Sequence, residues 1–143
     1  MASQPERQIL RLTVHKAKNL KVADGSGLAD CYVWIYLKVG GEKVAQKRSP
    51  IESQTRFPRW EYDFRWDLRE LSDSFHLPMS IIAHIQIWHH NVLAPDIPMG
   101  EFRLPFEFGH PTSESREWYS LQPRLHHNDK VSGEILLSFV FLG

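Results

Sequence analysis

A chain of 143 residues, of which 42% are hydrophobic and 24% charged, is long enough to bury one core and too apolar to be disordered. Its 17 basic and 17 acidic side chains give a formal net charge of zero, which excludes nucleic-acid binding driven by overall charge. The apolar runs fall well short of the roughly 20 residues of a transmembrane helix, so any membrane contact must come from a local patch.

We expect residues 1–143 to form a single domain, either a whole protein or the N-terminal module of a longer one. The chain has one cysteine, Cys31, which excludes an internal disulfide and fits a reducing compartment. Because residues 1–7 are polar and no apolar stretch follows them, no secretory signal peptide is expected. These features favour a cytoplasmic domain, peripheral at membranes if it contacts them.

Apolar and polar side chains alternate along most of the chain, and this period of two predicts β-strands. Glycine, proline and aspartate separate the alternating segments, as turns require. Residues 68–77 fit a short helix or an irregular crossing. Short strands separated by such turns are typical of an antiparallel β-sandwich. In chain order the predicted strands are residues 10–14, 32–39, 60–66, 81–88, 102–106 and 135–141.

Motifs spread over nearly the whole chain, and in the same order, resemble the C2 domain family. The resemblance implies an all-β fold, an eight-stranded antiparallel β-sandwich with loops clustered at one end. Because the Gly133-Glu134-Ile135 segment closes the chain, the strand order is similar to the permuted, type II arrangement. The other motifs are Leu10-x-Leu-x-Val-x-x-Ala17-x-x-Leu20, Asp30-Cys31-Tyr32-Val33, Thr55-Arg56-Phe57-Pro58-Arg59-Trp60 (with Phe57 where the family has asparagine), Ile87-Trp88, Met99-Gly100-Glu101-Phe102 and Glu117-Trp118-Tyr119.

Residues 87–102 have the frame of a calcium-binding loop and lack most of its carboxylates. Calcium takes about six to eight oxygen ligands, and its affinity rises with the number of carboxylates. This third loop offers Asp96, and the resemblance implies two further ligands, Asp24 and Asp30, in the first loop. Three carboxylates at most predict weak calcium binding at best, so we expect that no cofactor is required. Alternatively, Asp24 starts a turn and Asp30 caps a strand.

Two pairs of adjacent histidines raise the question of a different metal. Imidazole suits zinc or copper better than calcium, and His89 could join the two first-loop aspartates in a mixed site. However, adjacent side chains of an extended segment point apart, which favours His89 and His90 as polar surface residues. The same interpretation applies to His126 and His127.

The third loop also carries apolar side chains, and these predict contact with a membrane. Apolar residues on an exposed loop can enter the membrane interface without calcium. Alternatively, Val92 and Met99 fold back into the end of the core. The predicted membrane-facing residues are Leu28 in the first loop and Val92, Leu93, Ile97, Pro98 and Met99 in the third.

A basic patch is predicted from four cations on and after the second predicted strand: Lys38, Lys43, Lys47 and Arg48. A period of two puts Lys43 and Lys47 on one face and Arg48 on the other. The resemblance implies that such lysines bind phosphoinositide headgroups, and each cation near an anionic surface contributes about 1 kcal/mol. An ordinary solvated surface is the alternative.

The aromatic residues Trp34 and Tyr36 fall on the face opposite Val33 and Ile35, which we expect to point into the core. Because tryptophan and tyrosine are enriched in protein contacts, this pair predicts a surface for a protein partner or a second copy. Alternatively, the two rings only stabilise the sheet by packing across strands.

The sequence favours a non-catalytic module that binds anionic phospholipid without calcium. A protein-interaction or scaffolding module without lipid binding is one alternative, and weak calcium-dependent phospholipid binding is another. Catalysis is not expected, because Cys31 has no activating motif around it and no nucleophile or phosphate-binding motif occurs. The expected partner is an anionic membrane or a protein, not nucleic acid, and the oligomeric state stays open.

Overall fold

The computed structural model describes residues 9–21, 29–67, 79–108 and 114–142. Within these ranges the regular structure consists of nine β-strands, which confirms the all-β prediction. No helix in these ranges is long and apolar enough to cross a bilayer. The strands are β1 (Ile9–Lys18), β2 (Ala29–Val39), β3 (Glu42–Arg48), β4 (Glu52–Thr55), β5 (Arg59–Asp67), β6 (Met79–His89), β7 (Ile97–Phe108), β8 (Ser115–Ser120) and β9 (Glu134–Leu142).

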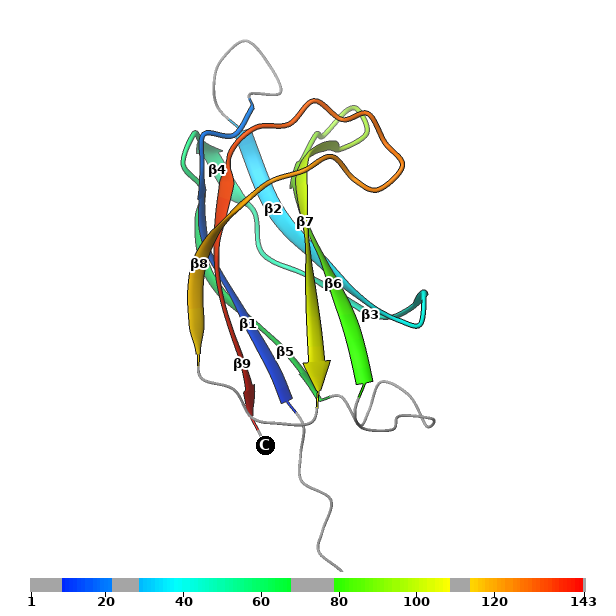
Figure 1. The fold of residues 1–143 in the computed structure, drawn as a ribbon. Coiled ribbons are helices and arrows are strands. Elements are labelled where there is room, and N and C mark those ends of the chain that lie inside the picture. The colour runs from blue at the N-terminus through cyan, green and yellow to red at the C-terminus, as the bar shows by residue number, and fades with distance from the viewer. Residues whose placement is uncertain (1–8, 22–28, 68–78, 109–113, 143) are drawn as a thin grey trace, which may run out of the picture.

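The strands form two sheets that pack face to face as a sandwich (Figure 1). Sheet I has the order β5-β1-β9-β8. Sheet II has the order β3-β2-β6-β7, with β4 also paired to β2. All pairings are antiparallel, so the predicted sandwich is confirmed.

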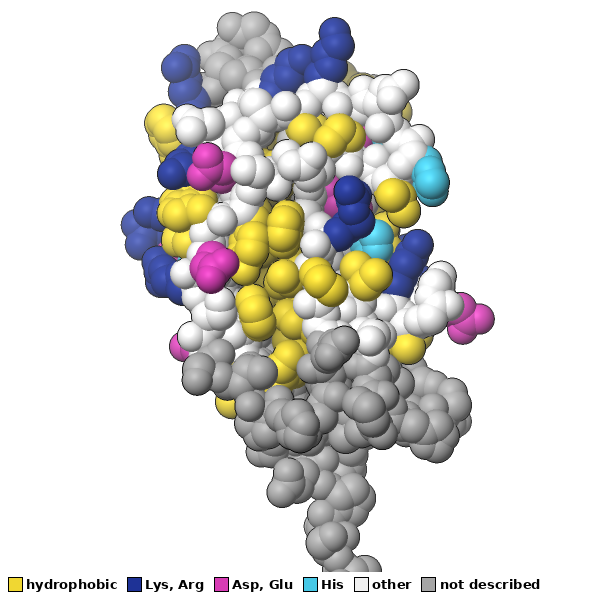
Figure 2. All heavy atoms as spheres, in the orientation of Figure 1, with side chains coloured by type: hydrophobic (Ala, Val, Ile, Leu, Met, Phe, Trp, Pro, Cys, Tyr) yellow, Lys and Arg dark blue, Asp and Glu magenta, His cyan; other side chains and the backbone are white. Residues whose placement is uncertain are grey.

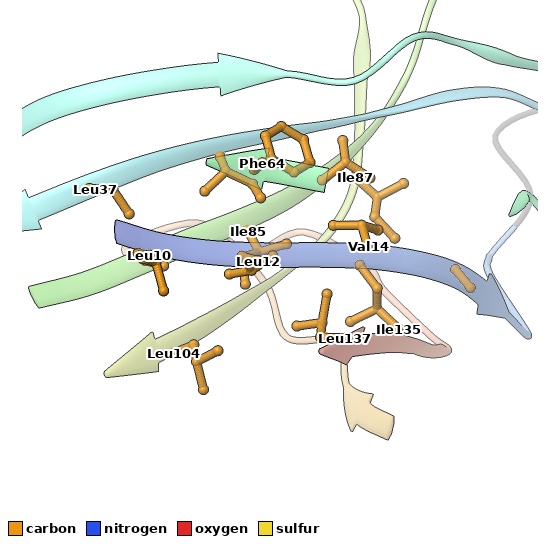
Figure 3. Packing of buried hydrophobic residues seen from close by; sticks show 14 of the residues in the cluster. Leu10, Leu12, Val14, Leu37, Phe64, Ile85, Ile87, Leu104, Ile135 and Leu137 are labelled. Carbon is orange, nitrogen blue, oxygen red and sulfur yellow. The ribbon is translucent and has the colours of Figure 1, made fainter. Parts of the chain in front are cut away.

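The core between the sheets comes from alternate positions of the strands, as the period of two predicts. Leu10, Leu12 and Val14 of β1 are fully buried, and Ile85 and Ile87 of β6 join them in one cluster (Figure 3). Each fully buried side chain of this size contributes roughly 1.5–3 kcal/mol relative to an exposed one. The core therefore fixes which face of each strand remains for contacts outside the sandwich.

The ninth strand arises because one edge strand of sheet II is interrupted. β3 pairs with the second half of β2 and β4 with its first residues, on the same side of β2. The interruption is Ser49-Pro50, and proline has no N–H for the ladder. The Ser49 hydroxyl instead accepts a hydrogen bond of 2.9 Å from the Val33 N–H, while the Ser49 N–H donates to the Val33 carbonyl. The described part of the chain thus has nine strands where eight were expected.

Two connections meet at the end of the sandwich where β2 begins, and we call residues 56–58 and 90–96 the tip. The Asp30 carboxylate accepts a hydrogen bond of 2.7 Å from the Gln54 N–H, on the strand that leads to residues 56–58. The Asp30 carbonyl accepts one of 2.8 Å from the His90 N–H. Asp30 therefore holds the two loops of the tip together.

The segment between β8 and β9, residues 121–133, crosses over the ends of β6 and β7, and we call it the arch (Figure 1). Its base is closed by a hydrogen bond of 3.0 Å from the Leu121 N–H to the Gly133 carbonyl. Gln122 pairs with Glu101 of β7 through two backbone hydrogen bonds of 2.7 and 2.8 Å. The arch thereby adds a wall to the outer face of sheet II.

Candidate functional site

Asp30 and Asp96, two of the predicted calcium ligands, both accept hydrogen bonds from the protein itself. Asp96 accepts one of 2.5 Å from the Tyr32 hydroxyl and one of 3.1 Å from the Asn91 N–H. It also lies 3.4 Å from Nδ1 of His90. The third predicted ligand, Asp24, lies outside the described residues. The Asp96 carboxylate thus holds the third loop closed onto β2.

The electrostatics of this region agree with that role. The hydrogen bond from Tyr32, followed by that from the Asn91 N–H, lowers the pKa of Asp96. Burial, followed by the bond to Asp96, raises the pKa of Tyr32 to about 12. Calcium needs about six to eight oxygens, and the described residues contain no group of three His, Cys, Asp or Glu that could hold a metal. Of the three predicted calcium ligands, the described residues include Asp30 and Asp96, and both carboxylates already accept hydrogen bonds within the protein.

The apolar residues of the third loop divide into exposed and buried ones. Leu93 is 99% exposed and Val92 87% exposed, so both are available for membrane contact. Met99 is only 3% exposed, and its assignment as membrane-facing is wrong. Ile97 is half-buried and packs against the core, and Pro98 is also half-buried. Leu28 lies outside the described residues.

The tip carries a further exposed hydrophobe that the sequence interpretation missed. Phe57, in the β4–β5 turn, is 67% exposed. It lines a hollow of about 220 Å³ together with Leu20 and Met99, and with the exposed cations Lys21 and Arg56. Figure 2 shows Lys and Arg side chains at the upper end of the molecule, where Figure 1 places the tip. Apolar and basic groups therefore lie side by side at this end.

The basic residues of β3 do not face the sides that a regular alternation along the strand predicts. β3 contains a β-bulge: Leu37 pairs with Ala45, but Lys38 pairs with Lys43, so Val44 is an extra residue. Beyond the bulge the facing of β3 is reversed. Arg48 therefore lies on the same outer face as Lys43, and the prediction that Lys43 shares a face with Lys47 is wrong.

The position of Lys47 follows from this reversal. Its Nζ lies 5.6 Å from the ring centre of Trp66 and donates a hydrogen bond to the Arg65 carbonyl on β5. Both partners belong to sheet I. Lys47 is therefore separate from the other three cations of the predicted patch.

The three remaining cations lie over aromatic rings, so the basic patch and the aromatic pair are one surface. Lys43 Nζ is 4.6 Å from the ring centre of Trp34 and 4.8 Å from that of Tyr36. Lys38 Nζ is 5.9 Å from the Tyr36 ring centre. The remaining pair is Arg48, whose guanidinium carbon is 4.5 Å from the ring centre of Tyr32. Cation–π contacts of this kind are worth about 0.5–1 kcal/mol at exposed sites.

The arch completes this surface on its other side. The guanidinium carbon of Arg124 lies 5.2 Å from the ring centre of Trp88, and Arg124 forms an ion pair with Asp129. Between the arch and sheet II lies a hollow of about 410 Å³. Its lining includes Trp34, Tyr36, Lys38, Gln86, Trp88, Glu101, Arg124, Leu125, His126 and His127. We call this hollow and the rings around it the aromatic groove.

A buried carboxylate supports the floor of the aromatic groove. Glu101 is fully buried and accepts hydrogen bonds from Gln86 and Arg103, with Nδ1 of His84 at 3.3 Å. Burial raises its pKa, but these bonds outweigh burial and hold the pKa at about 2. The ring of His84 stacks on Tyr36 with centres 4.5 Å apart. The groove thus rests on an ordered polar network.

The two pairs of adjacent histidines lie in different parts of the structure. His89 is buried, and its Nδ1 accepts a hydrogen bond of 3.0 Å from the Asp30 N–H, so this nitrogen is not directed at a metal. His90 lies beside Asp96. His126 and His127 are exposed on the arch and line the aromatic groove.

Sheet I contains a hydrogen-bonded chain that has the order of a catalytic triad. Ser138 Oγ lies 2.6 Å from Nε2 of His15, and Nδ1 of His15 lies 2.7 Å from a carboxylate oxygen of Glu61. The hydrogen bond with His15 lowers the pKa of Glu61. However, Ser138 is 3% exposed, so a substrate carbonyl cannot reach its hydroxyl. The three side chains join β9, β1 and β5 and form no nucleophilic site.

Comparison with known proteins identifies the architecture. The sequence pattern of the C2 domain matches residues 8–121. A probable serine/threonine-protein kinase of Dictyostelium discoideum is 29% identical over 134 residues, covering 92% of this chain and 12% of the kinase. Human synaptotagmin-5 is 35% identical over 78 residues, covering 54% of this chain and 18% of synaptotagmin-5. The chain thus spans less than a fifth of the length of these two relatives.

Among solved structures, the C2A domain of a plant extended synaptotagmin 1 superimposes with a TM-score of 0.72. The match covers 93% of this chain and 92% of that domain, at 20% sequence identity. At this identity the likeness concerns the fold alone, and it agrees with the sandwich described above.

Proposed function

Because this chain belongs to the C2 domain family, we propose that it is a non-catalytic module that attaches to anionic membrane surfaces without calcium. The observation that carries the proposal is the exposure of Phe57, Val92 and Leu93 on two loops at one end of the sandwich. Exposed apolar side chains gathered in this way are costly in water and mark a contact surface.

The energetics of insertion are adequate for reversible binding. Full burial of a Val, Leu or Phe side chain is worth roughly 1.5–3 kcal/mol, so the three residues offer on the order of 5 kcal/mol before the cost of association. Lys21 and Arg56, which line the hollow beside Phe57, add about 1 kcal/mol each near anionic lipid. The net charge of the chain does not oppose this, because the two cations act locally.

Calcium independence is supported by the hydrogen bonds that Asp30 and Asp96 already accept. Asp96 accepts hydrogen bonds from Tyr32 and Asn91, and Asp30 accepts one from the Gln54 N–H. An incoming calcium ion would have to compete with these donors, and the part of the chain that the structure describes contains no group of three His, Cys, Asp or Glu that could hold it. The insertion of apolar residues needs no such ion.

The test is co-sedimentation with vesicles of phosphatidylserine and phosphatidylcholine, or of phosphatidylcholine alone, each with calcium and with chelator. We expect the wild type to pellet with the anionic vesicles in chelator. Phe57→Ser with Leu93→Ser should weaken binding by about tenfold or more. The matched control is Leu142→Ser, which removes an exposed leucine on β9 and should leave binding unchanged.

Two results would contradict the proposal. Pelleting only in the presence of calcium would show that the tip binds the ion after all. Equal pelleting of the wild type and the Phe57→Ser, Leu93→Ser variant would show that the tip does not insert. The Leu142→Ser control separates insertion by the tip from general adhesion of exposed leucines.

A further inference from the structure

The aromatic groove differs from the tip in both position and chemistry, and it carries the next inference. It lies along the outer face of sheet II, whereas the tip lies at the end of the strands. We propose that the aromatic groove binds an acidic protein segment, an extended stretch rich in aspartate and glutamate that carries one apolar side chain.

The first support is the ordered state of the cations. Lys43 lies over Trp34 and Tyr36, and Arg48 lies over Tyr32. A long basic side chain normally loses rotamer freedom when it binds an anion. Contact with a ring removes part of that freedom beforehand, so these cations bind a carboxylate at lower entropic cost.

The second support is charge complementarity. Among the described residues, Lys38, Lys43 and Arg48 form no ion pair with a carboxylate. Two acids at the aromatic groove are already paired: Glu101 with Arg103 and Asp129 with Arg124. The surface that a ligand meets is therefore basic, although the chain as a whole is neutral.

The third support is the shape and apolar content of the groove. Tyr32 and Lys38 are six residues apart on β2, a span of about 20 Å that accommodates roughly six residues of extended chain. Leu125, on the arch, is 48% exposed and offers an apolar contact beside the rings. Aromatic and arginine residues around a recess are typical of protein-contact hot spots.

The recess favours a segment of protein over a membrane surface. The arch stands beside sheet II and forms with it a hollow of about 410 Å³, so the rings and cations line a recess and not a flat surface. When the tip meets a membrane, the groove lies on the side of the sandwich. Both contacts are therefore compatible, and the groove does not depend on the lipid function.

The test uses a fluorescein-labelled eight-residue peptide, Asp-Glu-Asp-Leu-Glu-Asp-Glu-Asp, and fluorescence anisotropy with the full chain. The wild type should bind it with a dissociation constant below about 1 mM, and Lys38→Gln with Lys43→Gln should weaken binding by about tenfold. The control variant, Lys47→Gln with Arg59→Gln, loses the same charge outside the groove and should bind within about twofold of the wild type. Thermal unfolding of both variants checks that they are folded.

Three results would overturn the inference. The first is absence of peptide binding by the wild type, and the second is equal weakening by both double variants, which would mean general charge attraction. The third comes from vesicles that contain phosphatidylinositol 4,5-bisphosphate. If the groove variant loses these vesicles while peptide binding is unchanged, the groove is a lipid site. Retained vesicle binding with lost peptide binding supports the inference.

Discussion

The Tyr32 hydroxyl donates a hydrogen bond of 2.5 Å to Asp96 and thereby joins β2 to the β6–β7 loop. Because Asp96 is half-buried and keeps the Asn91 N–H as a donor, the loss of this hydrogen bond costs about 1–2 kcal/mol. We therefore expect Tyr32→Phe to lower the free energy of unfolding by that amount in urea titrations, equally with calcium and with chelator.

A double-mutant cycle with Asp96→Asn isolates this bond from other effects of the two changes. The two substitutions should be non-additive by about 1 kcal/mol, because each alone already removes the charged hydrogen bond. Additive losses would show that Tyr32 and Asp96 stabilise the tip independently. A calcium-linked rise in stability of the wild type would contradict the reading of Asp96 as a structural residue.

The Glu101 carboxylate predicts a specific dependence of stability on pH. Its pKa of about 2 in the folded protein lies below the ordinary value of 4.5, which corresponds to roughly 3 kcal/mol. This stabilisation is fully present above about pH 4.5 and is lost as the pH falls toward 2, because the unfolded chain binds the proton first. Glu101→Gln should be less stable than the wild type at neutral pH.

The pH dependence is measured by urea unfolding of both proteins between neutral pH and about pH 3. The stability difference between wild type and Glu101→Gln should shrink as the pH falls. His84, Gln86 and Arg103 face this carboxylate and contribute to the effect. Parallel curves for the two proteins would show that Glu101 does not supply the acid-sensitive part.

We expect the removal of one oxygen atom, the Ser49 hydroxyl, to lower the stability of the protein. Its buried hydroxyl accepts the Val33 N–H at the interruption of the edge strand. Ser49→Ala leaves that N–H without its acceptor and should cost about 1–3 kcal/mol in chemical denaturation. Ser53→Ala, at an exposed position of β4, is the matched control and should stay within about 0.5 kcal/mol of the wild type. Equal effects of the two changes would argue against the role of Ser49.

We expect a side chain at Gly133, at the base of the arch, to lower the stability of the protein strongly. Its φ is 101°, and a Cβ there would collide with the backbone oxygens of Lys18 and Asn19. Gly133→Ala should therefore destabilise the protein by more than the roughly 1 kcal/mol typical of a positive φ alone. Gly41→Ala, with a φ of 84° and no atom within 4 Å of the added Cβ, measures the backbone cost without the collision. Similar thermal midpoints for the two variants would contradict this account.

The sequence could predict the sandwich because its core depends on alternation over whole strands, and that pattern tolerates local irregularity. Two wrong assignments share one cause, a β-bulge. Val44 is the extra residue that turns Arg48 toward Lys43, and a second register shift beside Met99 turns that side chain into the core. A bulge depends on the partner strand, so the residues of one strand do not reveal it.

One missed residue, Phe57, could have been identified from the sequence, whereas contacts between distant parts of the chain could not. Phe57 stands in a turn motif where the resemblance implies asparagine. An apolar residue in such a turn could have been predicted to be exposed, as Leu93 was. The contact of Lys43 with Trp34, by contrast, joins residues of two strands through their register. The arch beside Trp88 comes from the far end of the chain, and no local pattern indicates that approach.

The interrupted edge of sheet II also bears on solubility. An exposed, regular edge strand offers unpaired backbone groups to other chains and promotes aggregation. Here a bulge at Val44, the proline at Pro50 and the basic side chains of β3 disrupt one edge, and on the other edge Gln122 of the arch occupies the backbone of Glu101. The bulge, the proline and the arch therefore hinder edge-to-edge pairing of this sheet with a second molecule.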